Sequence, residues 1–335
     1  MKFLLSILLT FFTCCMLWIA LIYLQIGSKT NQSAWIQNYF EYKESRALAI
    51  QGNKVIIISG SNSLFGFDST TLEEEWGIPV INGAVNAGLG LQYILDRSKR
   101  ILRRGDTVLL PLEYDYYQSD GMPTVVQVDF LLSRDASYFR ELPLLEKLIV
   151  VSRTSFARLL EGLLRMGKEG SLPLDGRLST EKLNKCGDLI MLDSAELTES
   201  QRYDLDHALP VQIEDPQLSS TYVQTMDIYL GWAEREGVNV VAMPSSPMYF
   251  EDYRLEGHVE TMKNIKGYFR QHGIPFVGDP LGHMFEKKYY YDSAYHLNDK
   301  GIKRRTELVI DEFEKAEFSP STTPIKGERG IGLLA

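Results

Sequence analysis

Short apolar runs separated by helical patterns constrain the fold of this chain most strongly. The runs are rich in Val and Ile, bounded by turn residues, and occupy residues 54–59, 79–82, 106–111, 238–244 and 274–277. Strands that are apolar on both faces are typical of parallel sheets covered by helices on each side. The sequence therefore predicts an α/β fold built on a parallel sheet.

Helical patterns lie between most of these runs and end near glycines. The spacing of Thr70 and Glu73 predicts a capping box at the start of the first helix. Gly105 is expected to be the C-cap of the second. The expected helices are 70–76, 91–104, 219–236 and 258–272. Strands that alternate with helices in this way favour crossover connections between parallel strands.

An apolar run from Phe3 to Ile26 precedes the folded part of the chain. As a helix it would extend about 36 Å at roughly 1.5 Å per residue, which is enough to cross a bilayer. A cleaved signal peptide is the alternative, but the run exceeds the usual length of its apolar core, and no small-x-small site follows before Gly27. We expect a single-pass membrane protein whose main domain lies outside the cytoplasm.

The chain is expected to have four parts: residues 1–27 as a transmembrane anchor, 28–53 as a juxtamembrane connector with a helix at 35–48, 54–317 as the folded domain, and 318–335 as a disordered tail. About a hundred residues, 113–218, interrupt the strand–helix alternation and form an insertion. Its segment 138–166 has helical spacing, and either packs as ordinary helices or provides a lid or a surface that docks on a membrane partner.

Charge and cysteine content narrow the function classes. The net charge of −9 argues against nucleic acid or anionic lipid as the main partner and leaves neutral or sugar-like substrates open. Cys14 and Cys15 lie in the apolar run and Cys186 stands alone, so the rest of the chain forms no internal disulfide. No Cys/His spacing predicts a metal site, and no dinucleotide fingerprint predicts a cofactor.

Serine and histidine candidates follow predicted strands. Ser61 comes directly after the first strand, where side chains of a parallel sheet meet in one crevice, and Gly60 permits a tight turn there. Ser63 is the nearby competitor. Of five histidines, His283 and His296 follow the last strand, and only His296 has an acidic residue, Asp292, at a short spacing. A serine nucleophile needs such a base, oriented by a carboxylate.

These blocks resemble those of a known superfamily. The segments Ser-Gly-Ser-Asn-Ser-Leu-Phe-Gly (59–66), Asn-Gly-Ala-Val-Asn-Ala-Gly (82–88) and Asp-Ser-Ala-Tyr-His (292–296) resemble the SGNH (GDSL-like) hydrolase superfamily. They are similar to its membrane-anchored members in polysaccharide O-acetylation or teichoic acid D-alanylation. The resemblance implies a three-layer α/β/α fold with a flavodoxin-like, mainly parallel five-stranded sheet.

The resemblance also implies residue roles. Ser61 would be the nucleophile, His296 its base and Asp292 the acid that orients it, with the N–H groups of Ser61 and Gly88 as the oxyanion hole. The chain departs from the superfamily's pattern in three places: Ser59-Gly60-Ser61 replaces Gly-Asp-Ser, no Asn follows the third strand, and Asp292 lies four residues before the histidine instead of three.

Asn62, Glu113 and Ser245 are expected near the wall of the site. Glu113 has three possible roles: a polar wall, a general acid, or a carboxylate paired with an arginine, of which we favour the last. Ser245 belongs to a Pro-Ser-Ser-Pro segment that either shapes substrate access or forms a rigid turn.

Three functions follow as hypotheses. The first is a serine acyl-ester hydrolase or O-acyltransferase of the cell envelope, without cofactor, which acts on cell-surface polysaccharide or another acylated glycan beside a membrane-bound O-acyltransferase. The second is a weak or inactive scaffold of the same fold that binds a glycan or that acyltransferase. The third is a lipid-directed esterase.

Overall fold

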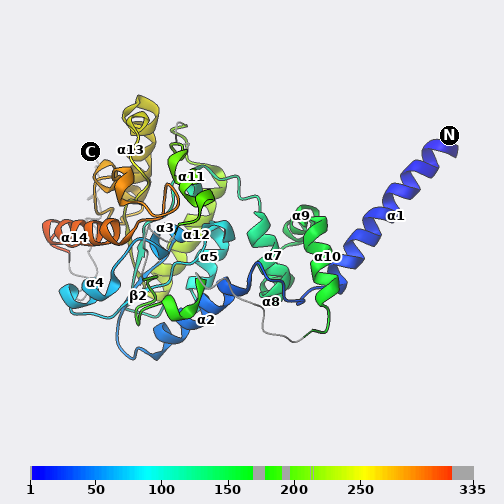
Figure 1. Cartoon of the computed structure of the whole chain (residues 1–335), viewed down its shortest axis with the longest axis horizontal. Coiled ribbons are helices and arrows are strands. Elements are labelled where there is room, and N and C mark those ends of the chain that lie inside the picture. The colour runs from blue at the N-terminus through cyan, green and yellow to red at the C-terminus, as the bar shows by residue number, and fades with distance from the viewer. Residues whose placement is uncertain (1, 169–177, 191–196, 212, 214, 319–335) are drawn as a thin grey trace, which may run out of the picture. The chain divides into compact units, whose positions relative to one another are not determined.

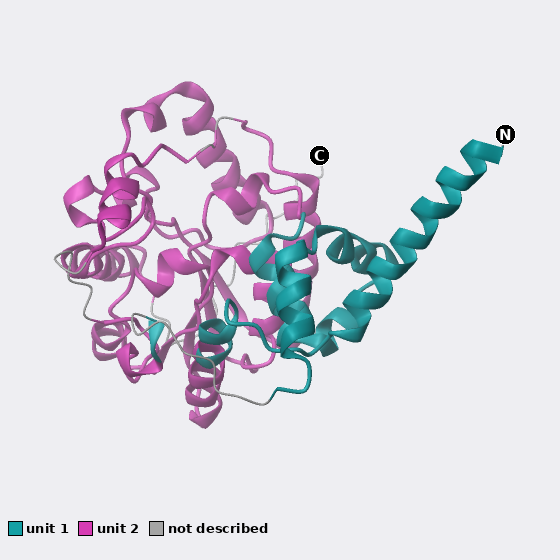
Figure 2. Ribbon diagram, turned by 45° about the vertical axis from the view of Figure 1, so that its right-hand side comes forward, with its two compact units in different colours: residues 1–38, 122–179 teal, residues 39–121, 180–335 magenta. Residues whose placement is uncertain are grey.

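The computed structural model describes residues 2–168, 178–190, 197–211, 213 and 215–318. The chain forms two compact units, 1–38 with 122–179, and 39–121 with 180–335 (Figure 2). Each is described below by itself. The predicted tail 318–335 lies outside the described residues except for Phe318.

The larger unit contains a parallel four-stranded sheet. Its strands are β1 (Val55–Ile57), β2 (Val80–Asn82), β3 (Thr107–Leu110) and β4 (Asn239–Ala242). The strand order is β2-β1-β3-β4, and every neighbouring pair is parallel. Each strand lies within one of the predicted runs, so the α/β class and the parallel sheet are confirmed.

The expected fifth strand, 274–277, does not form a strand in the structure. Phe276 makes a single parallel bridge to Ala242 at the edge of β4. Pro275 has no N–H to donate to a ladder, and the flanking Gly273 and Gly278 both have positive φ. The run therefore extends the sheet by one bridge only.

Helices cover both faces of the sheet. On one face, α4 (Ser69–Trp76) and α14 (Asp299–Lys315) pack over the sheet, in an apolar core that includes Val55, Leu109 and Phe313 (Figure 1). On the other face lie α5 (Leu91–Ser98) and α12 (Ser220–Glu236), joined by a hydrogen bond between the Ser98 and Tyr229 hydroxyls.

Two predicted caps differ in the structure. The N-cap of α4 is Asp68, whose carboxylate accepts the N–H groups of Thr70 and Thr71, so Thr70 does not cap the helix. Helix α5 ends at Ser98, and Gly105 lies in the turn before β3. In contrast, α12 begins after the N-cap Ser219 and ends at Gly237, as its pattern predicts.

The remaining elements of this unit form its loops and edges. They are α3 (Ser61–Leu64), η1 (Ala87–Leu89), α6 (Asp115–Gln118), η3 (Thr180–Lys182), α11 (Glu199–Asp206), η5 (Glu251–Arg254), α13 (Glu256–Gln271), η6 (Leu281–His283) and η7 (Lys287–Tyr289).

Helix α2 (Ala34–Ala49) confirms the expected helix at 35–48, and from residue 39 onward it belongs to the larger unit. Glu44 pairs with Arg97 of α5 at 2.6 Å. Lys43 is buried and donates to the carbonyl of Ala84. Burial lowers the pKa of Lys43 to about 7, against the opposing charge of Asp188.

The smaller unit is helical. It contains α1 (Lys2–Leu24), α7 (Val125–Ser133), α8 (Ala136–Glu141), α9 (Leu144–Arg153) and α10 (Phe156–Arg165). Helix α1 is long and apolar enough to cross a membrane by its length and composition. The predicted helical spacing of 138–166 corresponds to α8, α9 and α10. Polar contacts tie the segment after α1 to α7, such as Thr30 Oγ1 to Asp129 at 2.7 Å.

A buried ion pair at the start of the sheet provides a test of the larger unit. Lys54 Nζ lies 2.6 Å from Asp106 Oδ2, and both side chains are fully buried. Removing one partner leaves an uncompensated charge, so Asp106→Ala is expected to lower the free energy of unfolding by about 3–5 kcal/mol. Asp96→Ala removes the half-exposed partner of Lys99 and is expected to cost less than about 1 kcal/mol.

The free energy of unfolding of both variants is measured by urea unfolding of the detergent-solubilised chain. The transition is monitored with a spectroscopic signal that reports on the larger unit. Equal losses in the two variants would contradict this account.

Candidate active site

Ser61 is the first residue of α3, at the carboxyl end of β1. Its side chain is partly exposed, and its hydroxyl makes no hydrogen bond to the residues that the structure describes. Ser63 is fully buried and its hydroxyl accepts a hydrogen bond from Ser59 at 2.5 Å. Between the two candidates, only the Ser61 hydroxyl is open to a substrate.

Gly60 makes the turn into α3 possible through its small size. A Cβ at this position would lie 2.4 Å from Ala87 Cα and 2.5 Å from Glu113 Oε1. Real Cβ atoms do not approach other atoms this closely, so a side chain here would displace the turn that presents Ser61.

Glu113 follows β3, and its carboxylate accepts hydrogen bonds from the backbone at the start of α3. Its buried carboxylate accepts the N–H of Gly60 at 3.0 Å and that of Asn62 at 3.1 Å. Burial raises the pKa of this carboxyl above its ordinary value, and hydrogen bonds from Asn62 and Gly60 oppose that rise. Glu113 thus occupies two of the backbone donors beside Ser61 and has no surface facing a substrate.

Arg305, from α14, is the arginine on the other side of this turn. It is fully buried, and Nη1 donates to the carbonyl and side-chain oxygens of Asn62 at 3.1 and 3.2 Å. Burial lowers the pKa of Arg305 to about 9, although the charge of Glu113 opposes this. The two charges do not form a direct ion pair, because Asn62 lies between them.

His296 and Asp292 form the second half of the predicted site. His296 Nδ1 lies 2.7 Å from Asp292 Oδ1, and both side chains are partly exposed. Burial alone would raise the pKa of Asp292, but hydrogen bonding and charge from His296, with a hydrogen bond from Gln201, lower it below 3.8. The carboxylate is therefore ionised at neutral pH and fixes Nδ1 as the donor, which leaves Nε2 to accept a proton.

Stacking places the imidazole next to the segment that carries Ser61. The ring of His296 lies 4.1 Å from that of Phe65, centroid to centroid, and nearly parallel to it. Phe65 follows α3, and its N–H donates to the carbonyl of Ser61 at 3.0 Å. The segments that carry Phe65 and His296, more than 230 residues apart in sequence, therefore meet here.

The loop 291–297 is tied to the ends of three strands. Leu297 N–H donates to the carbonyl of Phe65 after β1, and Met248 N–H after β4 donates to that of Ala294. After β3, Tyr114 N–H donates to the hydroxyl of Tyr295 at 3.1 Å. These three bonds fix the position of the histidine loop over the carboxyl edge of the sheet.

Gly88, the second predicted oxyanion donor, already has a partner. Its N–H donates to Asn86 Oδ1 at 2.8 Å, inside the short helix η1. An oxyanion would have to displace that amide oxygen. The Ser61 N–H has no acceptor among the described residues, so it is the donor that stands ready.

The other predicted residues lie behind the site. Ser245 and Asn62 are fully buried, and Ser245 Oγ has no hydrogen-bond partner within the described part of the chain. His283 is buried and its Nε2 lies 2.7 Å from Glu312 of α14, so it joins elements of the fold. Burial also raises the pKa of Cys186 to about 11, which keeps this thiol protonated.

Sequence reasoning did not find four residues that position the site: Phe65, Gln201, Tyr295 and Arg305. Phe65 and Tyr295 lie inside the quoted blocks 59–66 and 292–296, but the sequence assigns them no role, because each of the four acts through a contact with a distant segment. Among the described residues, no group of three His, Cys, Asp or Glu side chains could hold a metal ion.

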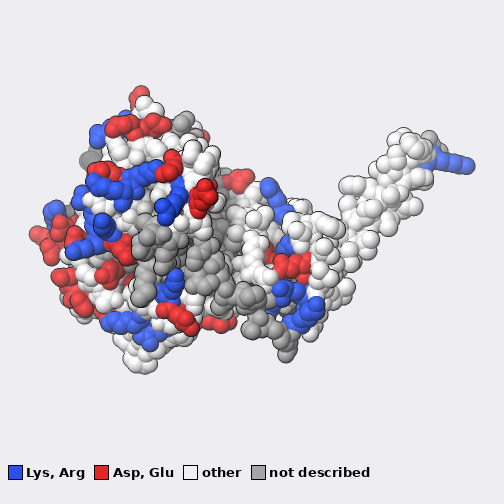
Figure 3. All heavy atoms as spheres, viewed as in Figure 1, with Lys and Arg blue, Asp and Glu red and all other residues white. Residues whose placement is uncertain are grey.

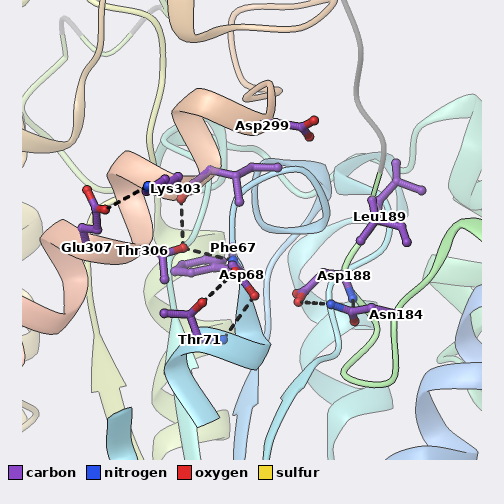
Figure 4. Close-up of a pocket in the computed structure, with 12 residues that line it drawn as sticks. Phe67, Asp68, Thr71, Asn184, Asp188, Leu189, Asp299, Lys303, Thr306 and Glu307 are labelled. Carbon is purple, nitrogen blue, oxygen red and sulfur yellow. Dashed lines mark hydrogen bonds and ion pairs between the residues drawn. The ribbon is translucent and has the colours of Figure 1, made fainter. Parts of the chain in front are cut away.

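A cavity of about 430 Å³ lies on the side of α14 and the loop before α4 (Figure 4). Its lining includes Asp68, Asp188, Lys303 and Thr306, and Thr306 Oγ1 accepts the N–H of Asp68 at 3.0 Å. None of Ser61, Asp292 and His296 lines this cavity, so the candidate chemistry lies outside it.

Comparison with protein-family models and with curated proteins gives no match to this chain. The assignment of a function therefore depends on the geometry and on the motif resemblance.

Gly60→Ala tests whether the turn before Ser61 is as tightly packed as these distances indicate. We expect the free energy of unfolding to fall by about 3 kcal/mol, the upper end for overpacking, because the new Cβ meets backbone. Gly267→Ala is the matched control: it lies in α13 with open space around it and should stabilise by about 0.5–1 kcal/mol. Thermal unfolding of the detergent-solubilised chain measures both, and a neutral Gly60→Ala would contradict the packing.

Proposed function

We propose that this chain is a membrane-anchored serine acyl-ester hydrolase or O-acyltransferase, which acts outside the cytoplasm on an acylated cell-surface polysaccharide. The observation that supports it most is the meeting of Asp292–His296 with the segment that begins at Ser61, through the stacked rings of His296 and Phe65. The resemblance to SGNH hydrolases supports the same roles for these residues.

In the proposed reaction, Ser61 Oγ attacks the carbonyl carbon of an ester while His296 Nε2 takes the hydroxyl proton. Asp292 holds the imidazole through Nδ1 and stabilises the cation that forms. The negative charge on the carbonyl oxygen is stabilised by the Ser61 N–H. Collapse of the intermediate expels the alcohol, which takes the proton from His296 and leaves an acyl-Ser61.

Water or a sugar hydroxyl completes the cycle by attacking the carbonyl carbon of the acyl-serine while His296 accepts the attacker's proton. The bond between the acyl carbon and Ser61 Oγ then breaks, and Ser61 Oγ takes that proton back from His296. Water gives hydrolysis, and a sugar hydroxyl gives transfer. The proposal also includes a membrane-bound O-acyltransferase as the partner of this chain, and α1 as the helix that anchors the chain in the membrane.

A scaffold without catalysis is the second candidate. The Glu113 carboxylate takes the N–H groups of Gly60 and Asn62, and Asn86 takes that of Gly88, so the oxyanion would have few donors. Removal of one such donor commonly costs 10²–10³ in rate, so these contacts favour a slow enzyme or a binding protein.

The Ser61→Ala variant separates the two candidates. We expect kcat/KM for acetyl esters to fall at least about 100-fold in Ser61→Ala and in His296→Ala, because each removes a member of one catalytic unit. Ser45→Ala is the matched control, since Ser45 is exposed on α2 and, among the described residues, its hydroxyl bonds only the carbonyl of Tyr42. Activity on acetyl esters of the purified full-length chain is the measurement.

Labelling with a fluorophosphonate gives an independent outcome. Stoichiometric modification of Ser61 is expected for the enzyme. A folded chain that is never labelled, and that loses no activity in Ser61→Ala, would refute the enzyme and leave the scaffold.

A further inference from the structure

Helix α10 turns its charged side inward, together with the buried Leu159, and turns its other large apolar side chains outward. Arg158 is buried and pairs with Asp129 of α7, with Nε 3.2 Å from Oδ1. On the same side, Glu161 accepts the N–H of Asn31 at 2.9 Å, and Arg165 donates to the Asn31 side chain at 2.8 Å. The charged residues of α10 therefore satisfy one another within the unit, the reverse of a helix in a water-soluble domain.

The outward side of α10 and of its neighbour α9 is apolar. These residues recur at helical spacing and each is close to half exposed or more: Leu144 73%, Leu145 69% and Leu148 47% on α9, and Phe156 70%, Leu160 46% and Leu164 62% on α10. A continuous apolar surface of this kind marks a site of contact with a partner or a membrane.

The same two helices pack against the end of α1. Trp18 Nε1 donates to the carbonyl of Val151 in α9 at 3.2 Å, and Arg158 of α10 donates to the Gln25 side chain. The outward apolar side chains of α9 and α10 therefore belong to helices that flank the end of α1. Helix α1 has no charged residue after Lys2, and its visible face is white in Figure 3.

The length of α1 provides a quantitative reason for this arrangement. The bare part of the helix, Lys2 to Leu17, has 16 residues and extends about 24 Å at roughly 1.5 Å per residue. The hydrocarbon core of a bilayer is about 30 Å thick. The rest of the hydrocarbon thickness is spanned by the turns of α1 from Trp18 onward. Because α9 and α10 flank these turns, they lie at the edge of the hydrocarbon core.

We propose that α9 and α10 lie in the interface of the lipid bilayer beside α1, with their outward apolar side chains inserted among the acyl chains. This rests on the proposed membrane anchor. Charge agrees with it: the smaller unit has ten Lys and Arg against seven Asp and Glu, whereas the whole chain has 35 against 44. Net positive charge beside an apolar surface favours anionic headgroups.

Nitroxide labels on the full-length chain, reconstituted in phosphatidylcholine–phosphatidylglycerol vesicles, test the proposal. Cys14, Cys15 and Cys186 are replaced by Ala, and single labels are placed at Leu160 and Leu164 of α10. Leu8 of α1 serves as the inserted reference, and Ile228 of α12, an apolar residue that is 59% exposed, as the control in the other unit.

Each label's collision rates with oxygen, which concentrates in lipid, and with a water-soluble nickel chelate are compared. The ratio of oxygen to nickel accessibility at Leu160 and Leu164 is expected to exceed that at Ile228 several-fold and to approach that at Leu8. A ratio equal to that of Ile228, with Leu8 in lipid, overturns this inference alone. Low accessibility to both reagents means that protein covers the surface, which also overturns it. A water-like Leu8 overturns the anchor as well.

Discussion

The buried carboxylate of Glu113 is the interaction on which the candidate site depends. It holds the N–H groups of Gly60 and Asn62, and Arg305 holds the carbonyl and side chain of Asn62 from the opposite direction. Two buried side chains, separated by Asn62, thus hold the turn: Glu113 accepts its N–H groups, and Arg305 donates to its oxygens. Because unpaired buried charges are costly, loss of either side chain would leave the other without a compensating charge nearby. Both side chains therefore contribute to the position of the turn that begins at Ser61.

This arrangement has a chemical consequence. The N–H groups of Gly60 and Asn62, which hold the turn in place through Glu113, are not available to an oxyanion. The same N–H groups therefore cannot both stabilise the turn and stabilise a transition state. When ionised, Glu113 beneath the turn also opposes negative charge that develops above it, and burial, which raises the pKa of this carboxyl, reduces that opposition. Arg305 offsets that effect, since its guanidinium lies across Asn62 from Glu113. Under the proposed function, the balance between these two side chains favours either an efficient catalyst or a binding surface.

The sequence predicts those features that local patterns encode. Runs of Val and Ile locate four strands, and the spacing of Asp292 and His296 anticipates their hydrogen bond. The predicted fifth strand does not form, because Pro275 has no N–H to donate to a strand ladder. The prediction used only the hydrophobicity of the run, which does not reflect this missing donor. Arg305 and Tyr295 were not predicted because their importance lies in contacts with Asn62 and Tyr114, which only the folded chain brings together.

The insertion shows a different limit. Its apolar pattern predicts helices. Which face of each helix packs against the rest of the unit depends on the contacts that its polar residues make. In α10, Arg158 and Glu161 are occupied within the unit, so the apolar side remains outside. In the proposed membrane arrangement, α1 alone supplies ample membrane affinity, so further apolar contacts would add little to attachment. Their effect would be on geometry: contacts beside α1 would restrict its rotation and tilt, and so would fix the depth at which the smaller unit leaves the bilayer.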